Sequence, residues 1–147
     1  MSALPNTVRV VAAALIAGGR VLIAERPPGK PMAGRWEFPG GKLAGDETEA
    51  QALARELREE LGVQMLEGRP MMRLTHPYAD RTVELSLWVV ERFRGEPRGL
   101  EGQALKWVEP ARLAEEDLLE ADRPFLAALV EWQSTPTARK DLHGRRH

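Results

Sequence analysis

The segment 49–61 constrains the fold most, because its residues fit an amphipathic helix with defined ends. Its leucines recur every fourth residue, which places an apolar stripe along one side of a helix. Thr48 and Gln51 have the spacing of a capping box at the start, and Gly62 is the residue type that commonly ends a helix. We therefore predict a helix over 49–61 that packs its leucines against a sheet.

Short apolar runs on both sides of this helix predict the strands of that sheet. The runs, bounded by glycine, proline or polar residues, cover 8–17, 20–26, 71–74, 83–93 and 104–108, with a brief strand at 36–38. The Gly-Gly pair between the first two runs indicates a β-hairpin. Two further helices are expected, one beginning at Pro110 and one over 123–132 with Asp122 as its cap. This order favours an α/β or α+β fold in which a mixed sheet lies between helices.

Length and composition limit the class of protein. With 147 residues and 43% hydrophobic residues, we expect one domain over 1–133 and a polar, basic, mobile tail over 134–147. The net charge of -1 argues against binding a nucleic-acid polymer through its backbone charge. The sequence contains no cysteine, which excludes disulfides and thiolate metal sites and favours a cytoplasmic location. The longest apolar run, 10–17, is too short to cross a membrane.

Three carboxylates lie together on the predicted helix. Glu56, Glu59 and Glu60 are three and four residues apart, so we expect them on one face, opposite the leucine stripe. A solvated acidic face is the alternative, but the helix dipole disfavours anions in the last turn by about 0.3–1 kcal/mol. Two carboxylates about 4 Å apart also repel by about 4 kcal/mol at an effective dielectric constant of 20. Clustered oxygens without histidine or cysteine indicate Mg²⁺, or Mn²⁺ as a substitute, often bound together with substrate phosphates.

The segment 41–63 resembles the Nudix box. That pattern is glycine, five residues, glutamate, seven residues, Arg-Glu-aliphatic, one residue, Glu-Glu, one residue and glycine-aliphatic. Every defined position is filled, by Gly41, Glu47, Arg55, Glu56, Leu57, Glu59, Glu60, Gly62 and Val63. The sequences WEFPGGK (36–42), WVVERF (88–93), GEP (95–97), EGQ (101–103) and ADRP (121–124) also resemble the MutT-type branch, in the same order.

The resemblance implies a Nudix-type α/β/α sandwich and hydrolysis of a nucleotide. In the MutT-type branch, water attacks the β-phosphorus of a nucleoside triphosphate, giving a nucleoside monophosphate and pyrophosphate, while metal ions neutralise the phosphate oxygens. The implied metal ligands are Glu56, Glu59, Glu60, Glu101 and the Gly40 carbonyl. Glu56 or Glu101 would accept the proton of the water, and the sequence does not choose between them.

The remaining positions of the motif are expected to support this site. Arg55 and Glu47 would brace the loop and the helix, and Gly41 would let the backbone approach the carboxylates closely. Lys42 would meet a phosphate oxygen of the substrate.

The residues that read the base are where this sequence departs from the MutT-type branch. Arg26 matches the branch's arginine at the end of the second strand, but Asp122 replaces its asparagine before the last helix. An ionised aspartate only accepts hydrogen bonds, which suits the imidazole N–H of 8-oxoguanine and also the exocyclic amine of cytosine. Asp122 would serve equally as a helix cap. Tyr78 lies in a turn where the branch has an aromatic near the base, although a tyrosine in a hairpin is also ordinary.

These residues lead to three hypotheses about function. The first is a Mg²⁺-dependent nucleoside triphosphate pyrophosphohydrolase that removes 8-oxo-dGTP from the nucleotide pool. The second, motivated by Asp122, is a pyrophosphohydrolase of CTP, dCTP or a methylated form. The third is a catalytically silent nucleotide-binding module, which a missing box glutamate would favour, and none is missing. The expected partner is a small nucleotide, with no polymeric nucleic acid and no membrane, and the sequence leaves the oligomeric state open.

Overall fold

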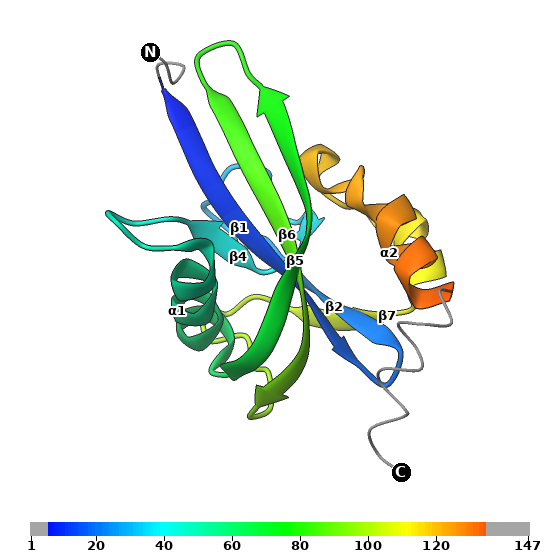
Figure 1. Ribbon diagram of the computed structural model, residues 1–147. Helices are drawn as coiled ribbons and strands as arrows, with labels where there is room; N and C mark the ends of the chain where they lie inside the picture. The colour runs from blue at the N-terminus through cyan, green and yellow to red at the C-terminus, as the bar shows by residue number, and fades with distance from the viewer. Residues whose placement is uncertain (1–5, 135–147) are drawn as a thin grey trace.

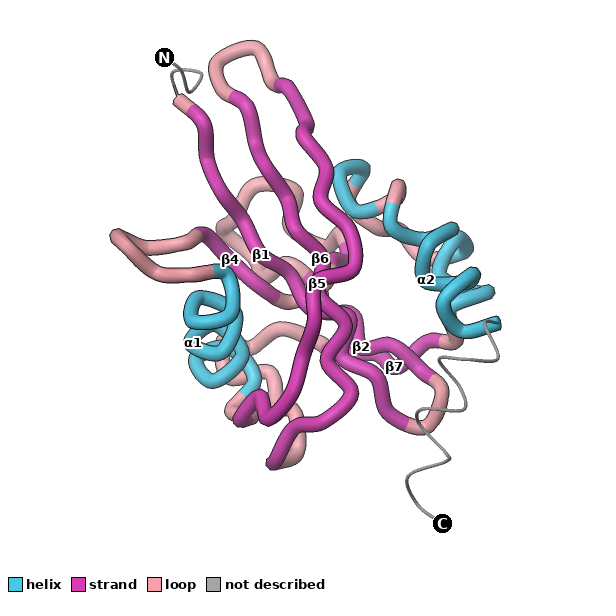
Figure 2. Tube along the Cα trace, viewed as in Figure 1, coloured by secondary structure: helices cyan, strands magenta, loops and turns pink. Residues whose placement is uncertain are grey.

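The computed structural model describes residues 6–134 and shows a mixed sheet between two helical layers (Figure 1). In chain order the elements are β1 (Thr7–Ala17), β2 (Arg20–Glu25), β3 (Trp36–Glu37), β4 (Gly40–Lys42), α1 (Glu49–Leu61), β5 (Gln64–Pro77), β6 (Thr82–Arg94), β7 (Leu105–Val108), the 3₁₀ helices η1 (Pro110–Glu115) and η2 (Glu120–Asp122), and α2 (Phe125–Ser134). Helix α1 covers one face of the sheet, and α2 with the 3₁₀ helices covers the other (Figure 2). The predicted fold class is confirmed.

The sheet is mixed because β1 and β6 run parallel while the remaining pairs are antiparallel. The strand order is β3-β2-β1-β6-β5, with β4 pairing to β1 and β7 to β2. Gly18 and Gly19, with φ of 59° and 76°, form the turn between β1 and β2. Two consecutive residues at positive φ suit the right-handed twist of a hairpin, and glycine adopts this conformation freely.

The central strand β1 is buried on both faces, which explains its continuous apolar run. Alternate side chains along a strand point to opposite faces, so β1 contributes to two separate apolar cores. The α1-side core contains Val11, Ala13, Leu15, Leu22, Leu53, Leu57, Leu61 and Val90. The α2-side core contains Ala12, Ala14, Ile16, Phe38, Leu87, Phe125 and Leu129. The four tryptophans are partly buried against one or the other of these cores.

Helix α1 has both of its predicted ends. The Thr48 side chain accepts a hydrogen bond from the Gln51 backbone, and the Gln51 side chain accepts one from the Thr48 backbone, which completes the capping box. Gly62 adopts the left-handed conformation, with φ of 73°, and its N–H donates to the carbonyl of Arg58. The helix therefore begins and ends where the sequence predicts, and its leucines are fully buried.

Two strands differ from the sequence prediction. Residues 40–42, which were not assigned to a strand, form β4, because their backbone pairs with residues 10–12 of β1. Strand β5 extends far beyond the predicted 71–74, since β6 pairs with it along its length. Gly68 and Pro70 discourage a strand by propensity, and they are accommodated here at shifts in the β5–β6 register.

The C-terminal helices also differ in detail. The helix expected from Pro110 is the short 3₁₀ helix η1, and α2 begins at Phe125 instead of residue 123. Asp122 ends η2, and its Oδ2 accepts a hydrogen bond from the Phe38 N–H at 3.2 Å, so the predicted cap of α2 is wrong. Ser134 belongs to α2, and the rest of the expected tail, 135–147, lies outside the described residues. Within 6–134, no helix is both long and apolar enough to cross a membrane.

The capping box of α1 provides a test of this account of the fold. Replacing Thr48 by alanine removes the oxygen that accepts from Gln51, and we expect the free energy of unfolding to fall by about 1 kcal/mol. Urea denaturation of T48A against the wild type measures the loss. Thr48→Ser, which keeps the hydroxyl, should lie near the wild type, and equal losses in both variants would contradict a role for the cap.

Candidate active site

The glycine pair of β4 brings backbone against both β1 and α1. A Cβ at Gly40 would meet the carbonyl oxygen of Val11 on the neighbouring strand. A Cβ at Gly41 would collide with the carboxylate of Glu56 on α1. Only glycine allows both approaches, and together they place a carboxylate directly on the backbone of β4.

Arg55 ties this strand, the following loop and α1 together. Its Nε and Nη2 donate to the two carboxylate oxygens of Glu47 at 2.6 and 2.9 Å, and Nη2 also donates to the Lys42 carbonyl at 3.1 Å. Its Nη1 donates to Glu56 at 3.1 Å and to Glu59 at 3.4 Å. The hydrogen bonds from Arg55 lower the pKa of Glu47 to about 2, so this pair remains charged at all ordinary pH values. Arg55 therefore links the loop to α1 and orients the carboxylates of Glu56 and Glu59.

The carboxylates predicted to share one face of α1 lie in different environments. The side chain of Glu56 is 16% exposed and that of Glu59 is 56% exposed. Burial, followed by the hydrogen bond with Glu56 and the negative charges of Glu56 and Glu101, raises the pKa of Glu60 to about 9. The reason for the difference is tertiary, since β4 and the segment 95–103 flank this side of α1.

Glu101 reaches the group from the segment 95–103, which hydrogen bonds fasten to the end of α1. The backbone N–H of Leu100 donates to the Glu60 carbonyl at 3.0 Å, and Gln103 Nε2 donates to the same carbonyl at 3.2 Å. Gln103 Oε1 accepts from the Glu101 N–H at 2.8 Å. The buried Gln103 was not among the predicted site residues, although its place in the EGQ motif could have indicated a role in holding this segment.

The chemistry of this donor set fits a hard divalent cation. All of the side-chain donors are carboxylates, and burial together with the neighbouring negative charges raises the pKa of Glu60. In the part of the chain from 6 to 134, however, no three such side chains already converge closely enough to hold a metal ion. Since Arg55 contacts both Glu56 and Glu59, a cation would have to compete with the guanidinium for these carboxylates.

A second group of polar side chains lies at the ends of β2 and β3 and before α2. Arg26 Nη1 pairs with Glu37 Oε1 at 2.9 Å, and Arg26 Nε donates to the Pro31 carbonyl at 2.7 Å. Asp122, only 5% exposed, accepts a hydrogen bond from the Phe38 N–H. The charge of Glu37 raises its pKa and the charge of Arg26 lowers it. Burial raises the pKa of Asp122 to about 7. Arg26 and Asp122, far apart in sequence, therefore lie in one group, which we call the Arg26–Asp122 cluster.

Glu37 is the member of this cluster that the sequence analysis missed. Burial, opposed by Arg26, raises its pKa. Its negative charge in turn raises the pKa values of both Glu60 and Asp122. Glu37 thus lies electrostatically between the carboxylates of α1 and the Arg26–Asp122 cluster. Its signal was the WEFPGGK sequence, in which residues 36–38 were assigned only to a strand.

Two other candidate residues are less tightly placed. Lys42 is exposed on β4, and only its carbonyl is held, by Arg55. Tyr78 belongs to the turn between β5 and β6, and this turn lies near the N-terminal end of β1 (Figure 1). Its ring contacts are with His76, at 4.7 Å between centroids, and with the guanidinium of Arg81, at 5.1 Å. These contacts lie within its own hairpin, and neither involves the Arg26–Asp122 cluster.

Comparison with known proteins found a matching family model, similar sequences and similar structures. A model described as NUDIX domain matches residues 11–128. A relative named CTP pyrophosphohydrolase, from Escherichia coli, is 40% identical over 84% of this chain and 91% of its own. An 8-oxo-dGTP diphosphatase from the same organism is 38% identical over 74% of this chain and 84% of its own. The solution structure of the E. coli ORF135 protein has a TM-score of 0.81 and 38% identity, covering 90% of this chain and 95% of that one.

The buried Asp122 should make stability depend on pH. Because folding raises its pKa from 3.8 to about 7, its favourable contribution is complete below pH 3.8 and is lost as the pH rises through 7. Relative to Asp122→Asn, the wild type should therefore lose up to about 3 kcal/mol of unfolding free energy between pH 5 and 8. Urea denaturation across this range measures the difference.

The control for this measurement is Asp80→Asn, which changes a 77% exposed aspartate in the β5–β6 turn. D80N should follow the wild type at every pH. If D122N also parallels the wild type, Asp122 is not the titrating group.

Proposed function

The chain belongs to the NUDIX domain family and is a Nudix hydrolase, and we propose that it is a divalent-metal-dependent nucleoside triphosphate pyrophosphohydrolase whose preferred substrate is 8-oxo-dGTP. The supporting observation is that the structure contains two groups of polar side chains, each suited to a different part of a nucleotide. One is a set of carboxylates on a glycine pair, suited to a metal-bound polyphosphate. The other is the Arg26–Asp122 cluster, suited to a base, and the charge of its member Glu37 acts on both groups.

In the proposed reaction the carboxylates of Glu56, Glu59, Glu60 and Glu101, with the Gly40 carbonyl, hold the metal. Bound there, Mg²⁺ or Mn²⁺ would neutralise the charge that develops on the phosphate oxygens during attack at the β-phosphorus. Lys42, exposed at the end of β4, would add a positive charge for a phosphate oxygen. Glu56 or Glu101 would accept the proton of the attacking water.

Arg55 and Glu47 act in this proposal as positioning residues. Their bidentate pair holds the loop after β4 against α1, which keeps the Glu56 carboxylate over Gly41. A reacting group held by a rigid partner loses less entropy at the transition state than one that must be ordered during the reaction. The pair therefore contributes without touching the substrate.

The environment of Asp122 bears on the choice of base. Because its pKa is raised to about 7, a substantial fraction of this carboxyl is neutral at physiological pH, and a neutral carboxyl both donates and accepts, as asparagine does. The neutral form can accept from the N7–H of 8-oxoguanine while donating to its O6. Ordinary guanine presents acceptors at both N7 and O6, which leaves one oxygen facing a lone pair. Asp122 therefore supports selection of the oxidised base despite replacing an asparagine.

CTP is the second candidate substrate, and a specific similarity favours it. A relative covering most of this chain carries the name CTP pyrophosphohydrolase. Cytosine offers an exocyclic amine as donor, which an aspartate accepts in either protonation state. Asp122 alone thus does not separate the two bases, and a direct comparison of substrates is needed.

We expect turnover of 8-oxo-dGTP to exceed that of dGTP and CTP when all are measured under the same metal conditions. The physical reason is the adjacent N7–H donor and O6 acceptor that 8-oxoguanine presents to Asp122. The measurement is kcat/KM from release of pyrophosphate for each nucleotide. A preference for CTP would replace the first candidate substrate by the second.

The same reaction in ¹⁸O-water locates the bond that breaks. Attack at the β-phosphorus puts the label into pyrophosphate. Label in the nucleoside monophosphate would refute this site of attack, whichever base is preferred.

Replacing Glu59 by glutamine should impair catalysis far more than folding. The side chain is 56% exposed, and among residues 6–134 it interacts with Arg55 alone, at 3.4 Å, so its loss costs little stability. Loss of a metal-binding charge should reduce metal affinity and rate by at least about 10- to 100-fold. The measurements are metal-dependent kinetics and thermal unfolding of the same preparation.

Glu115→Gln is the matched control, because Glu115 is 66% exposed and pairs only with Arg112 on η1. We expect this variant to keep both the rate and the melting temperature of the wild type. An unfolded E59Q, or activity undiminished by excess chelator, would contradict the proposed metal site.

A further inference from the structure

A hollow of about 390 Å³ lies at the end of the α1-side core, away from the glycine pair. Three segments border it, namely the turn between β1 and β2, the end of β6 with the residues that follow, and β7. Its size falls within the range of sites that bind small molecules in proteins. None of its residues belongs to the carboxylate group or to the Arg26–Asp122 cluster.

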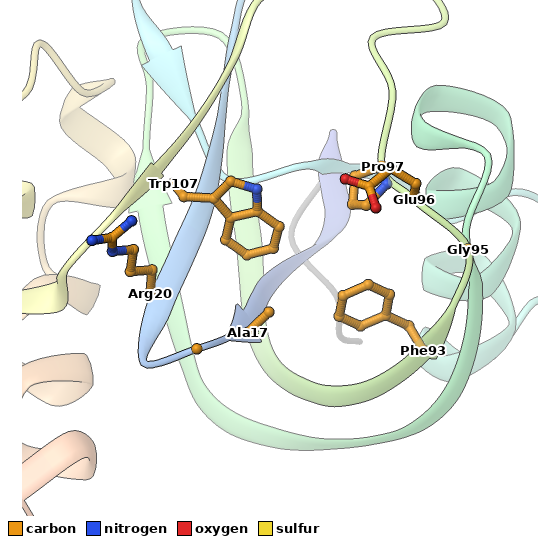
Figure 3. Close-up of a pocket in the computed structure, with 8 residues that line it drawn as sticks. Ala17, Arg20, Phe93, Gly95, Glu96, Pro97 and Trp107 are labelled. Carbon is orange, nitrogen blue, oxygen red and sulfur yellow. The ribbon is translucent and has the colours of Figure 1, made fainter.

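Two aromatic side chains of the α1-side core line this hollow. Phe93 and Trp107 are partly buried residues packed against that core. Helix α1 ends at Leu61, and the two rings, which are only partly buried, lie at the solvent-exposed edge of this core. Figure 3 shows both rings directed into the same space, with the indole on the β7 side and the phenyl ring on the β6 side. The rings therefore offer two apolar surfaces to a ligand lying between them.

Two charged side chains of opposite sign stand at the rim. Figure 3 draws Glu96 on the side to which the nitrogen of the Trp107 indole points, and Arg20 on the opposite side of that indole. Both side chains are exposed. Among residues 6–134, neither makes an ion pair or a side-chain hydrogen bond, although most other arginines of the sheet are paired. The hollow thus combines aromatic walls with an unpaired acceptor and an unpaired cation.

We propose that this hollow is a second ligand site, for a planar heteroaromatic ring that carries one anionic group. The ring would lie between Trp107 and Phe93, where aromatic surfaces favour stacking. Its N–H donors would face Glu96, and its anionic group would pair with Arg20. Nucleoside monophosphates have this chemistry, and choosing them as the ligand rests on the proposed function, because they would be its product.

The position of the hollow connects it to the candidate active site. Residues 95–97, which form one wall of the hollow, are the first residues of the segment 95–103 that carries Glu101. That segment is fastened to α1 where the Arg98 N–H donates to the Leu61 carbonyl and the Leu100 N–H donates to the Glu60 carbonyl, both at 3.0 Å. A ligand against this wall would therefore alter the surroundings of Glu101 as well as those of the rings.

The test is titration of the ¹⁵N-labelled full chain with GMP and CMP, followed by NMR in the presence of chelator. The chelator removes metal-dependent phosphate binding at the carboxylates. We expect saturable shifts of the Trp107 indole N–H, assigned with Trp107→Phe, and of the Gly18 and Gly95 amides, with smaller shifts at Glu101. Glu96→Gln and Arg20→Gln should each weaken binding about tenfold, the usual worth of a hydrogen bond to a charged group.

Matched controls are Glu115→Gln and Arg112→Gln, which change an exposed pair on η1 and should leave the affinity unchanged. The proposal is overturned if these signals do not shift at millimolar nucleotide, or if ribose 5-phosphate, which lacks a ring, shifts them equally. Shifts that depend on protein concentration alone would assign the hollow to a second copy of the chain instead. Hydrolysis of 8-oxo-dGTP with metal, measured separately in E96Q and R20Q, reports on the proposed function independently.

Discussion

The contacts of Arg55 are the interaction on which the candidate active site depends. One planar guanidinium joins the loop carboxylate of Glu47, the backbone of β4 at Lys42, and two carboxylates of its own helix. A lysine could not satisfy these partners together, because it lacks the rigid fork of donors. The geometry also requires α1 to start in register, which the capping box at Thr48 secures, and β4 to approach without side chains, which the glycine pair permits. Strand, loop and helix are thereby held as one unit.

Two charged groups of different character meet around Glu37. On the α1 side, burial and the charges of neighbouring carboxylates raise the pKa of Glu60, and a divalent cation would offset those charges. On the α2 side, burial keeps Asp122 partly neutral, which suits hydrogen bonding to a base more than electrostatic attraction. A nucleoside triphosphate needs both kinds of environment, one for its phosphates and one for its ring. The charge of Glu37 acts on a carboxyl of each kind, Glu60 and Asp122.

Sequence patterns within a single element predicted those parts of the fold that depend on interactions between residues close together in the chain. The cap, the leucine spacing and Gly62 set α1 from end to end, and Gly18-Gly19 set the hairpin of β1 and β2. Strand β4 and most of β5 could not be predicted, since neither has strong strand propensity and both form by pairing with β1 and β6. The prediction that Asp122 caps α2 was wrong because it, too, depended on a contact between distant parts of the chain. Its position before a helix suggests a cap, whereas its contact with Phe38 arises from chain segments 84 residues apart.

By itself, the sequence determined the identity and spacing of the acidic residues, because the helical period alone brings Glu56, Glu59 and Glu60 close together. It also determined the family, through the box and the motifs that follow it. Only the tertiary structure decided which carboxylates are buried, that Arg55 binds two of them, and that the charge of Glu37 acts on both Glu60 and Asp122. Burial and charge proximity depend on residues that are distant in the chain, and periodicity within one element carries no information about them.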